Sequence, residues 1–226
     1  MAAEPTKIRT ATVHARLRAD ILGGVLCPGS RLKFAELCDE YDASVGGVRE
    51  ALTRLVEQGL VTSEPRIGFR VVSLSLDDLD DLTATRVDLE GLALRYSLQH
   101  GDVTWEANLV AAHHTLERTP LLAEDDPPRV SDDWERAHVA FHAALIAGCG
   151  RPRLRCMIDS LRDAAELYRR WSQPHDPDRD VAAEHRQLLE TALARDADAA
   201  TSALAAHFER TAQILRATSG LACDDS

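Results

Sequence analysis

Residues 31–70 constrain the fold of this chain most strongly, because helix and strand signals follow one another there over a short distance. Apolar residues at helical spacing predict a short helix over residues 34–41. Ser44 is a favourable N-cap for the helix that follows, over residues 45–58. After that helix, two short apolar runs around a turn that contains Pro and Gly predict a β-hairpin within residues 60–72.

A further helix is expected over residues 7–23, ahead of this stretch. Three helices followed by a hairpin are the layout of a winged helix-turn-helix, in which one helix enters the major groove of DNA. We therefore predict an N-terminal winged helix-turn-helix over residues 1–73 that binds double-stranded DNA.

The remainder of the chain favours helix throughout, so the predicted fold class is mainly α. Residues 74–76 are a predicted linker, and residues 77–226 form an all-helical domain of about six helices with a disordered C-terminal tail. Breaks at Gly and Pro place the expected helices at residues 77–100, 103–119, 131–148, 151–173, 178–195 and 197–219. A helical bundle can build ligand and metal sites between its facing helices.

Charge is divided unevenly between the two predicted domains. Residues 1–76 carry 10 Lys and Arg against 9 Asp and Glu, whereas residues 77–226 carry 16 against 28. A near-neutral head on an acidic body fits a DNA-binding protein whose body repels phosphate. The N-terminus has no apolar signal-peptide region, and the sequence has no apolar stretch of about 18 residues or more. We therefore expect a cytoplasmic protein with no membrane partner.

The N-terminal region resembles the GntR family of transcription regulators. The matching residues are Ile21–Leu32, Val48-Arg49-Glu50-Ala51-Leu52, Leu55, Gly59-Leu60-Val61 and Gly68. The resemblance implies that Arg31, at the start of the second helix, and Arg49, within the recognition helix, contact DNA. It also implies that Gly68 lets the wing approach the minor groove. Arginine offers a bidentate fork for guanine or phosphate, and glycine permits close approach of the backbone.

Two other residues of this region are candidate DNA contacts. Ser44 caps the helix whose N-terminus faces the groove, where backbone amides can bind phosphate, and Arg54 lies one turn and a half beyond Arg49. As an alternative, Arg49 and Arg54 are solvated surface residues. The family usually has Ser-Arg-Thr-Pro where this chain has Ser44-Val45-Gly46-Gly47. The chain thus lacks one arginine that reads bases, and we expect an altered operator or a lower affinity.

Four histidines form the second candidate site. His138 and His142 are four residues apart and share one face of a helix, while His185 and His207 lie on two later helices. Three helices of a bundle can bring four side chains to one interior point. Imidazole ligands suit a divalent transition metal, with Zn or Ni expected here. The alternative is that each buried histidine is a hydrogen-bonded core residue.

The second part of the chain, from about residue 77 to 219, resembles the FCD ligand-sensing domain of the FadR-like branch of GntR regulators. The matches are Arg86-Val-Asp-Leu89-Glu90, Phe141-His142, Glu184-His185, Ala192-Leu193 with Asp196, and His207-Phe208. Metal-binding members have an Asp at the position of His138, so the resemblance implies either four histidine ligands or a site in which His138 leans away.

The resemblance also implies a small carboxylate effector. Arg86 matches a position that lines the family's pocket, and its alternative is an ion pair with Glu90 at i,i+4 spacing. Helical spacing adds Arg162 and Tyr168 as candidate effector contacts.

We therefore predict a regulator, not an enzyme, that represses transcription as a homodimer on a palindromic operator and responds to an organic acid bound near a metal. Two alternatives remain open. In the first, the metal ion itself is the signal. In the second, the protein is a metal-dependent hydrolase, for which Glu184 is the nearest candidate base.

Overall fold

The computed structural model describes residues 4–65, 68–73, 75–124, 130–172, 176 and 178–217, with side chains from Thr12 onward. The chain divides into two compact units, of which the first ends at Ser75 and the second is Leu76–Ala217. The predicted C-terminal tail and the wing residues Arg66 and Ile67 lie outside the described residues. No helix of the described part has both the length and the apolar character needed to cross a membrane.

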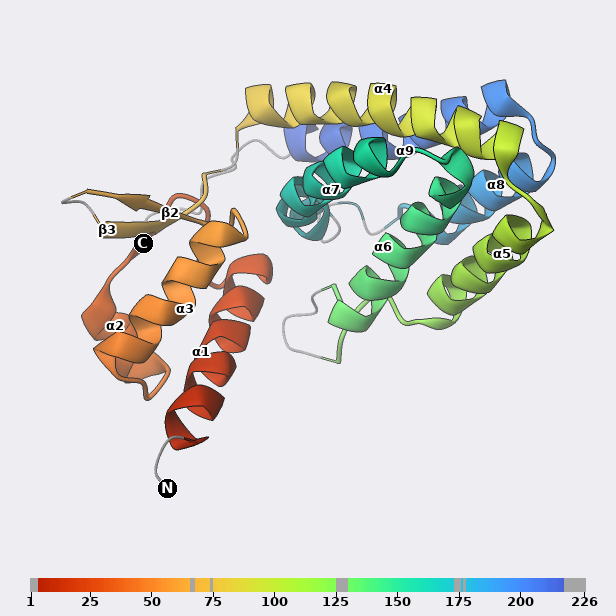
Figure 1. Ribbon diagram of the computed structural model, residues 1–226. Helices are drawn as coiled ribbons and strands as arrows, with labels where there is room; N and C mark the ends of the chain where they lie inside the picture. Colours follow the sequence, from red (N-terminus) through yellow and green to blue (C-terminus); the bar gives the residue numbers. More distant parts are fainter. Residues whose placement is uncertain are drawn as a thin grey trace. The chain divides into compact units, whose positions relative to one another are not determined.

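The N-terminal unit has the predicted three helices, α1 (Glu4–Leu22), α2 (Phe34–Glu40) and α3 (Val45–Glu57) (Figure 1). They pack around fully buried aliphatic side chains, which include Leu17, Ile21, Leu52 and Leu55. The amphipathic pattern of α3 explains its place, because Val48, Ala51, Leu52 and Leu55 recur every three to four positions along one face and are buried in this core.

The predicted wing hairpin consists of β2 (Val61–Glu64) and β3 (Gly68–Val71), which pair antiparallel. A third strand that was not predicted, β1 (Arg31–Leu32), pairs with the other edge of β3. A two-residue strand leaves no visible period-2 pattern. Arg31 was therefore wrongly placed at the start of the second helix; it pairs with Arg70 in the sheet, and the helix begins at Phe34.

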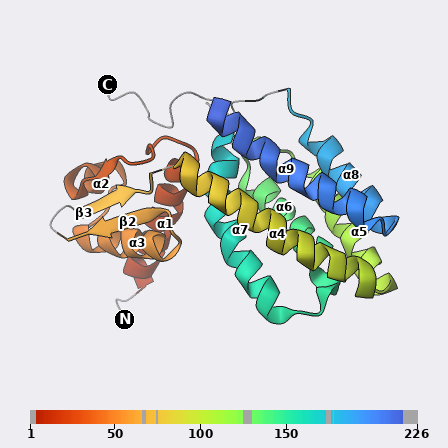
Figure 2. The same cartoon turned by 90° about the horizontal axis from the view of Figure 1, so that it is seen from above.

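The C-terminal unit is helical, as predicted. Leu76, which the sequence assigned to the linker, is the first residue of its first helix. The unit contains α4 (Leu76–His100), α5 (Val103–Arg118), α6 (Asp132–Leu145), a short 3-10 turn η1 (Ala147–Cys149), α7 (Pro152–Ser172), α8 (Val181–Leu193) and α9 (Ala197–Ala217). In both ribbon views α4 and α9 lie side by side along the unit (Figures 1 and 2). One buried apolar cluster joins the helices, with Phe141, Leu94 and Leu109 fully enclosed.

Candidate functional site

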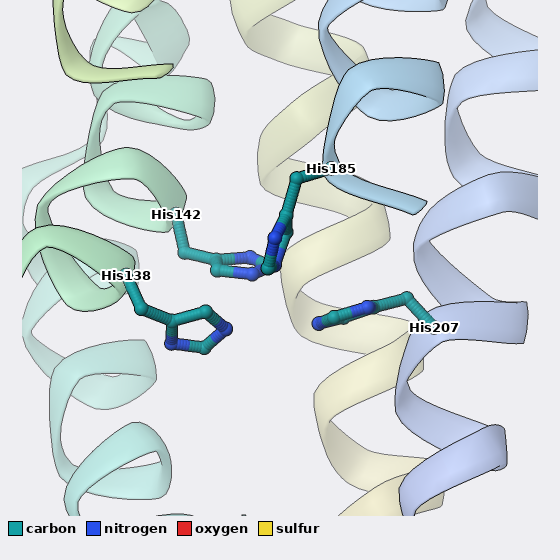
Figure 3. A group of neighbouring side chains, drawn as sticks. All are labelled: His138, His142, His185 and His207. Atoms are coloured by element: carbon teal, nitrogen blue, oxygen red, sulfur yellow. The ribbon is translucent and has the colours of Figure 1, made fainter. Parts of the chain in front are cut away.

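The four histidines predicted as ligands meet inside the C-terminal unit. His138 and His142 extend from α6, His185 from α8 and His207 from α9, and the four rings point toward one another (Figure 3). One nitrogen from each ring can be chosen so that all four lie within 4.8 Å of one another. The four residues are only 2–5% exposed.

Helix periodicity and core packing together bring these rings to one point. His138 and His142 occupy successive turns of α6, and their ring centroids are 4.5 Å apart. Phe141 lies between them in sequence, is fully buried and anchors α6 in the core. The Trp134 ring stacks on His138 at 4.8 Å, which restricts that imidazole from one side. On the opposing helices, the rings of His185 and His207 are 4.8 Å apart.

The hydrogen bonding of the cluster fits a metal ion. Neither ring nitrogen of His142 has a hydrogen-bond partner, and Nε2 of His185 has none. Leaving a buried polar atom unbonded costs about 1–3 kcal/mol. A metal bound at about 2.1 Å by each nitrogen would satisfy these atoms, and a tetrahedral shell would hold them about 3.4 Å apart. The four nitrogens lie within 4.8 Å of one another, so the pairs would close by up to about 1.4 Å when zinc is coordinated.

Burial also sets the protonation state that metal ligation requires. Desolvation lowers the pKa of each of the four imidazoles, and it lowers those of His138, His142 and His185 far below the ordinary value. The charge of Arg169 further lowers the pKa of His138. At neutral pH the rings are therefore uncharged, which leaves nitrogen lone pairs available to a cation.

Glu184 and Arg179 fix the orientation of one imidazole. Oε2 of Glu184 lies 2.6 Å from Nδ1 of His207, so that Nε2 is the nitrogen left to face the cluster. Arg179 donates two hydrogen bonds to the Glu184 carboxylate, at 2.7 and 2.8 Å. Burial opposes ionisation of Glu184, but the hydrogen bonds from Arg179 and His207 outweigh it and lower its pKa to about 2. The sequence offered Glu184 as a family match and as a possible base, but it gave no sign of the role of Arg179.

The two arginines predicted to bind an effector converge on a buried glutamate. Arg86 donates a hydrogen bond to Oε1 of Glu90 at 2.9 Å, as the alternative of an i,i+4 ion pair predicted. Arg162 reaches Oε2 of the same carboxylate from α7, with hydrogen bonds of 2.6 and 3.0 Å. It also donates to the backbone carbonyl of His142 at 2.8 Å, so this arginine pair borders the histidine cluster.

The charged groups around this cluster are only partly paired within the interior. Arg86, Arg162 and Arg169 are buried beside the buried carboxylates of Glu90 and Glu135, and Nη1 of Arg162 lies 3.6 Å from the exposed carboxylate of Asp159. Nη1 of Arg162 and Nε of Arg169 make no hydrogen bond, although both atoms are enclosed. Buried N–H donors in proteins are normally hydrogen-bonded, so these two atoms are available to an acceptor. Arg169 was not predicted as a site residue, because its spacing along the helix does not distinguish it from other arginines.

Tyr168 contacts a different residue from the one that Arg86 and Arg162 share. Its hydroxyl donates a hydrogen bond of 2.8 Å to Asp78 near the start of α4. Of the three predicted effector contacts, Arg86 and Arg162 therefore lie beside the histidine cluster, and Tyr168 is not placed there by this hydrogen bond.

A pocket of about 230 Å³ reaches His185 on another side of the cluster. Its wall also includes Trp134, Arg179 and His113.

The candidate DNA contacts lie on or beside α3 and the wing. Ser44 is the N-cap of α3, as predicted, and its hydroxyl accepts a hydrogen bond from the Gly47 amide at 3.2 Å. Arg49 is exposed, and its guanidinium lies 4.8 Å from the centre of the Phe34 ring. Arg54 is exposed and forms an ion pair with Glu50 at 3.2 Å.

The two remaining candidates are on strands. Arg31 on β1 is exposed. Gly68 begins β3 with φ of +102°, a backbone angle that favours glycine, and an added Cβ would meet no atom there. Both positions therefore leave room for a partner molecule.

The family models match both units. The model described as bacterial regulatory proteins of the gntR family matches residues 9–71, and the FCD domain model matches residues 81–210. BphR of Paraburkholderia xenovorans, an uncharacterized HTH-type transcriptional regulator, is 42% identical over 89% of this chain and 82% of its own length. GlaR of Escherichia coli, an HTH-type transcriptional repressor, is 34% identical over 85% of this chain and 89% of its own length.

A solved structure of the same kind also resembles the whole chain. A GntR-type transcriptional regulator from Rhodococcus sp. RHA1 has a TM-score of 0.66 and 25% identity, and the match covers 92% of this chain and 98% of that one.

Proposed function

The chain belongs to the GntR family of bacterial regulatory proteins and carries an FCD domain, and on that basis we propose that it is a metal-containing repressor controlled by a small carboxylate. Members of this family are DNA-binding transcription regulators and not enzymes. Repression is supported by GlaR, a named repressor that shares 34% identity with this chain. The proposed protein is a homodimer that binds a palindromic operator.

On DNA, α3 lies in the major groove and its first turn faces the bases. Arg49 contacts a base edge or a phosphate, and Arg54 and Arg31 contact the phosphate backbone. Ser44 keeps the N-terminus of α3 formed, so that its free amides face the DNA. Gly68 lets the backbone of the wing approach the minor groove. The exposure of these residues in the N-terminal unit supports these roles.

In the C-terminal unit, His138, His142, His185 and His207 hold a divalent transition metal, either zinc or nickel. The observation that carries this assignment is the set of buried, unbonded imidazole nitrogens on three converging helices. When bound, the metal supplies a positive charge that an anionic ligand can approach. Glu184 holds His207 in the tautomer that presents Nε2, and Arg179 holds Glu184 in place.

A small carboxylate is the effector class that best fits the surrounding charge. Arg86 and Arg162 face the cluster from α4 and α7. With Arg169 they place three buried guanidinium groups beside two buried carboxylates, and the further partner of Arg162, Asp159, is exposed. The unbonded N–H groups of Arg162 and Arg169 are suited to carboxylate oxygens. Tyr168 contributes from further along α7 if the bound acid extends that far. Binding of the acid changes operator affinity only if the acid binds more tightly to one conformational state of the protein than to the other.

A second candidate, in which the metal ion itself is the signal, is favoured by the ligand count. Four imidazoles complete a tetrahedral shell and leave no open position. The same count weakens the hydrolase alternative, which needs an open position for water. Glu184 is also unsuited as a base, because hydrogen bonds to Arg179 and His207 lower its pKa to about 2.

The test combines metal analysis with operator binding. The full chain, purified without chelators, is expected to hold one metal per subunit and to lose operator affinity when a small organic acid is added. A His142→Ala, His185→Ala double variant is expected to lose the metal and the response to acid but to keep operator binding. His114→Ala, an exposed histidine outside the cluster, is the control.

Three results would decide against parts of this proposal. Stoichiometric metal in the double variant would remove the site. Operator affinity that follows free metal at micromolar concentration, with no acid effect, would establish the ion as the signal. Operator affinity that changes neither with metal nor with acid would mean that the histidine cluster has no regulatory role.

A further inference from the structure

The first residue of the recognition helix α3 is an exposed valine. We propose that Val45 contacts the 5-methyl group of a thymine in the major groove and thereby specifies one base of each operator half-site. The proposal rests on the DNA-binding role of the N-terminal unit and on nothing inferred about the metal.

Burial separates Val45 from the other apolar residues of its helix. Val48, Leu52 and Leu55 are fully buried and explain how α3 packs, whereas Val45 is 52% exposed. The core therefore does not account for an aliphatic side chain at this position. A partner that covers Val45 would remove apolar surface from water, which the free protein leaves exposed.

The neighbours of Val45 leave it accessible. Ser44 is turned back to cap the helix through the Gly47 amide, so its hydroxyl is engaged locally. Gly46 has no side chain, and a Cβ built there would meet only Ser44 Oγ at 3.9 Å. Val45 is therefore the bulkiest side chain among Ser44–Gly47, the segment that leads α3 into the groove.

The nearest arginines of α3 are held by other partners in the free protein. Arg49, one turn further on, lies over the Phe34 ring, and Arg54 pairs with Glu50. The leading end of the helix thus presents an apolar group rather than a hydrogen-bonding one. On the major-groove edge of the base pairs, the apolar feature that an aliphatic side chain can recognise is the thymine methyl.

Replacing thymine by uracil tests this contact directly, because it removes the methyl and keeps every hydrogen-bonding group of the base. The operator is first selected from random duplex DNA with the full-length protein. Each thymine is then replaced by uracil in turn, and affinities are measured for the natural chain and for Val45→Ser. Val25→Ser is the matched control, because Val25 is also an exposed valine, at 67%, but lies outside α3.

Loss of one methyl contact is expected to lower affinity about fourfold per half-site. One symmetric thymine position should show this loss with the natural chain and with Val25→Ser, and no loss with Val45→Ser. The proposal is overturned if no thymine position responds to uracil, or if Val45→Ser responds as the natural chain does. A chain that selects no sequence at all would overturn both the proposal and the DNA-binding role of α3.

Discussion

The two units of the molecule place their functional charges in opposite environments. Glu50 and Arg54 in α3 form an i,i+4 ion pair whose side chains are about half exposed, at 54% and 48%. Arg86 and Glu90 in α4 form an ion pair of the same spacing, but their side chains are 7% and 1% exposed. The first pair remains free to exchange its partner for a phosphate, whereas the second is part of the interior. The proposed recognition surface and the proposed sensing site thus use the same residue types with different physical consequences.

The largest expected difference follows from removing one carboxylate from each pair. Glu90→Gln leaves Arg86 without its ion-pair partner and leaves Arg162 with only the exposed Asp159, and it should lower the free energy of unfolding by about 3–5 kcal/mol. The matched change Glu50→Gln should stay within about 0.5 kcal/mol of the natural chain. Urea unfolding followed by circular dichroism measures both. Equal losses of unfolding free energy in the two variants would mean that burial does not determine how much each ion pair contributes to stability.

Acidification should destabilise the C-terminal unit of the metal-free protein selectively. Burial lowers the pKa of His138, His142, His185 and His207 in the folded state, so the unfolded chain binds more protons below its ordinary histidine pKa of about 6.5. Stability is therefore present above about pH 6.5 and is lost as the pH falls, by at most about 1.4 kcal/mol per pH unit for each histidine.

Tryptophan fluorescence isolates this effect, because Trp105, Trp134 and Trp171 all belong to the C-terminal unit. Unfolding by urea at pH 7.5 and 5.5 should give a lower midpoint at the acid pH. The His142→Ala, His185→Ala variant should lose less stability over the same range. An equal loss in the variant would assign the acid sensitivity to other groups.

A smaller effect, confined to DNA binding, is expected from the N-terminal unit. Arg49→Ala should weaken operator binding by about 1–3 kcal/mol, because a base or phosphate contact is lost, and should leave metal content unchanged. Arg16→Ala is a closely matched control, because Arg16 lies over the Tyr41 ring at the same 4.8 Å that separates Arg49 from Phe34. Gel-shift titrations compare the two variants. Equal losses would point to a shared structural cause rather than to contact with DNA.

The contrast between the units also explains which features could be predicted from sequence. The N-terminal unit is built from local signals, such as the Ser44 cap and the Val48, Leu52 and Leu55 stripe, so the ends of its three helices were predicted to within three residues. The strand β1 was missed because two residues carry no periodicity. Pairing with β3 is a tertiary interaction, and it moved Arg31 from the start of a helix into a sheet.

In the C-terminal unit, helix spacing predicted that His138 and His142 share a face, and the expected helical bundle allowed His185 and His207 to join them. The charged groups around them could not be predicted in the same way. Glu90 meets Arg162 across 72 positions of sequence, and only the packing of α4 against α7 creates that contact. Burial of Arg169 and the role of Arg179 likewise depend on tertiary packing.

Anomalous X-ray diffraction from crystals of the full chain, purified from its native cells without chelators, tests the metal assignment most directly. Data collected on either side of the absorption edge of the metal should give one peak per subunit among the rings of His138, His142, His185 and His207, with about 2.0–2.1 Å from metal to nitrogen for zinc. Metal present in stoichiometric amount, with no peak among these four rings, would contradict the account.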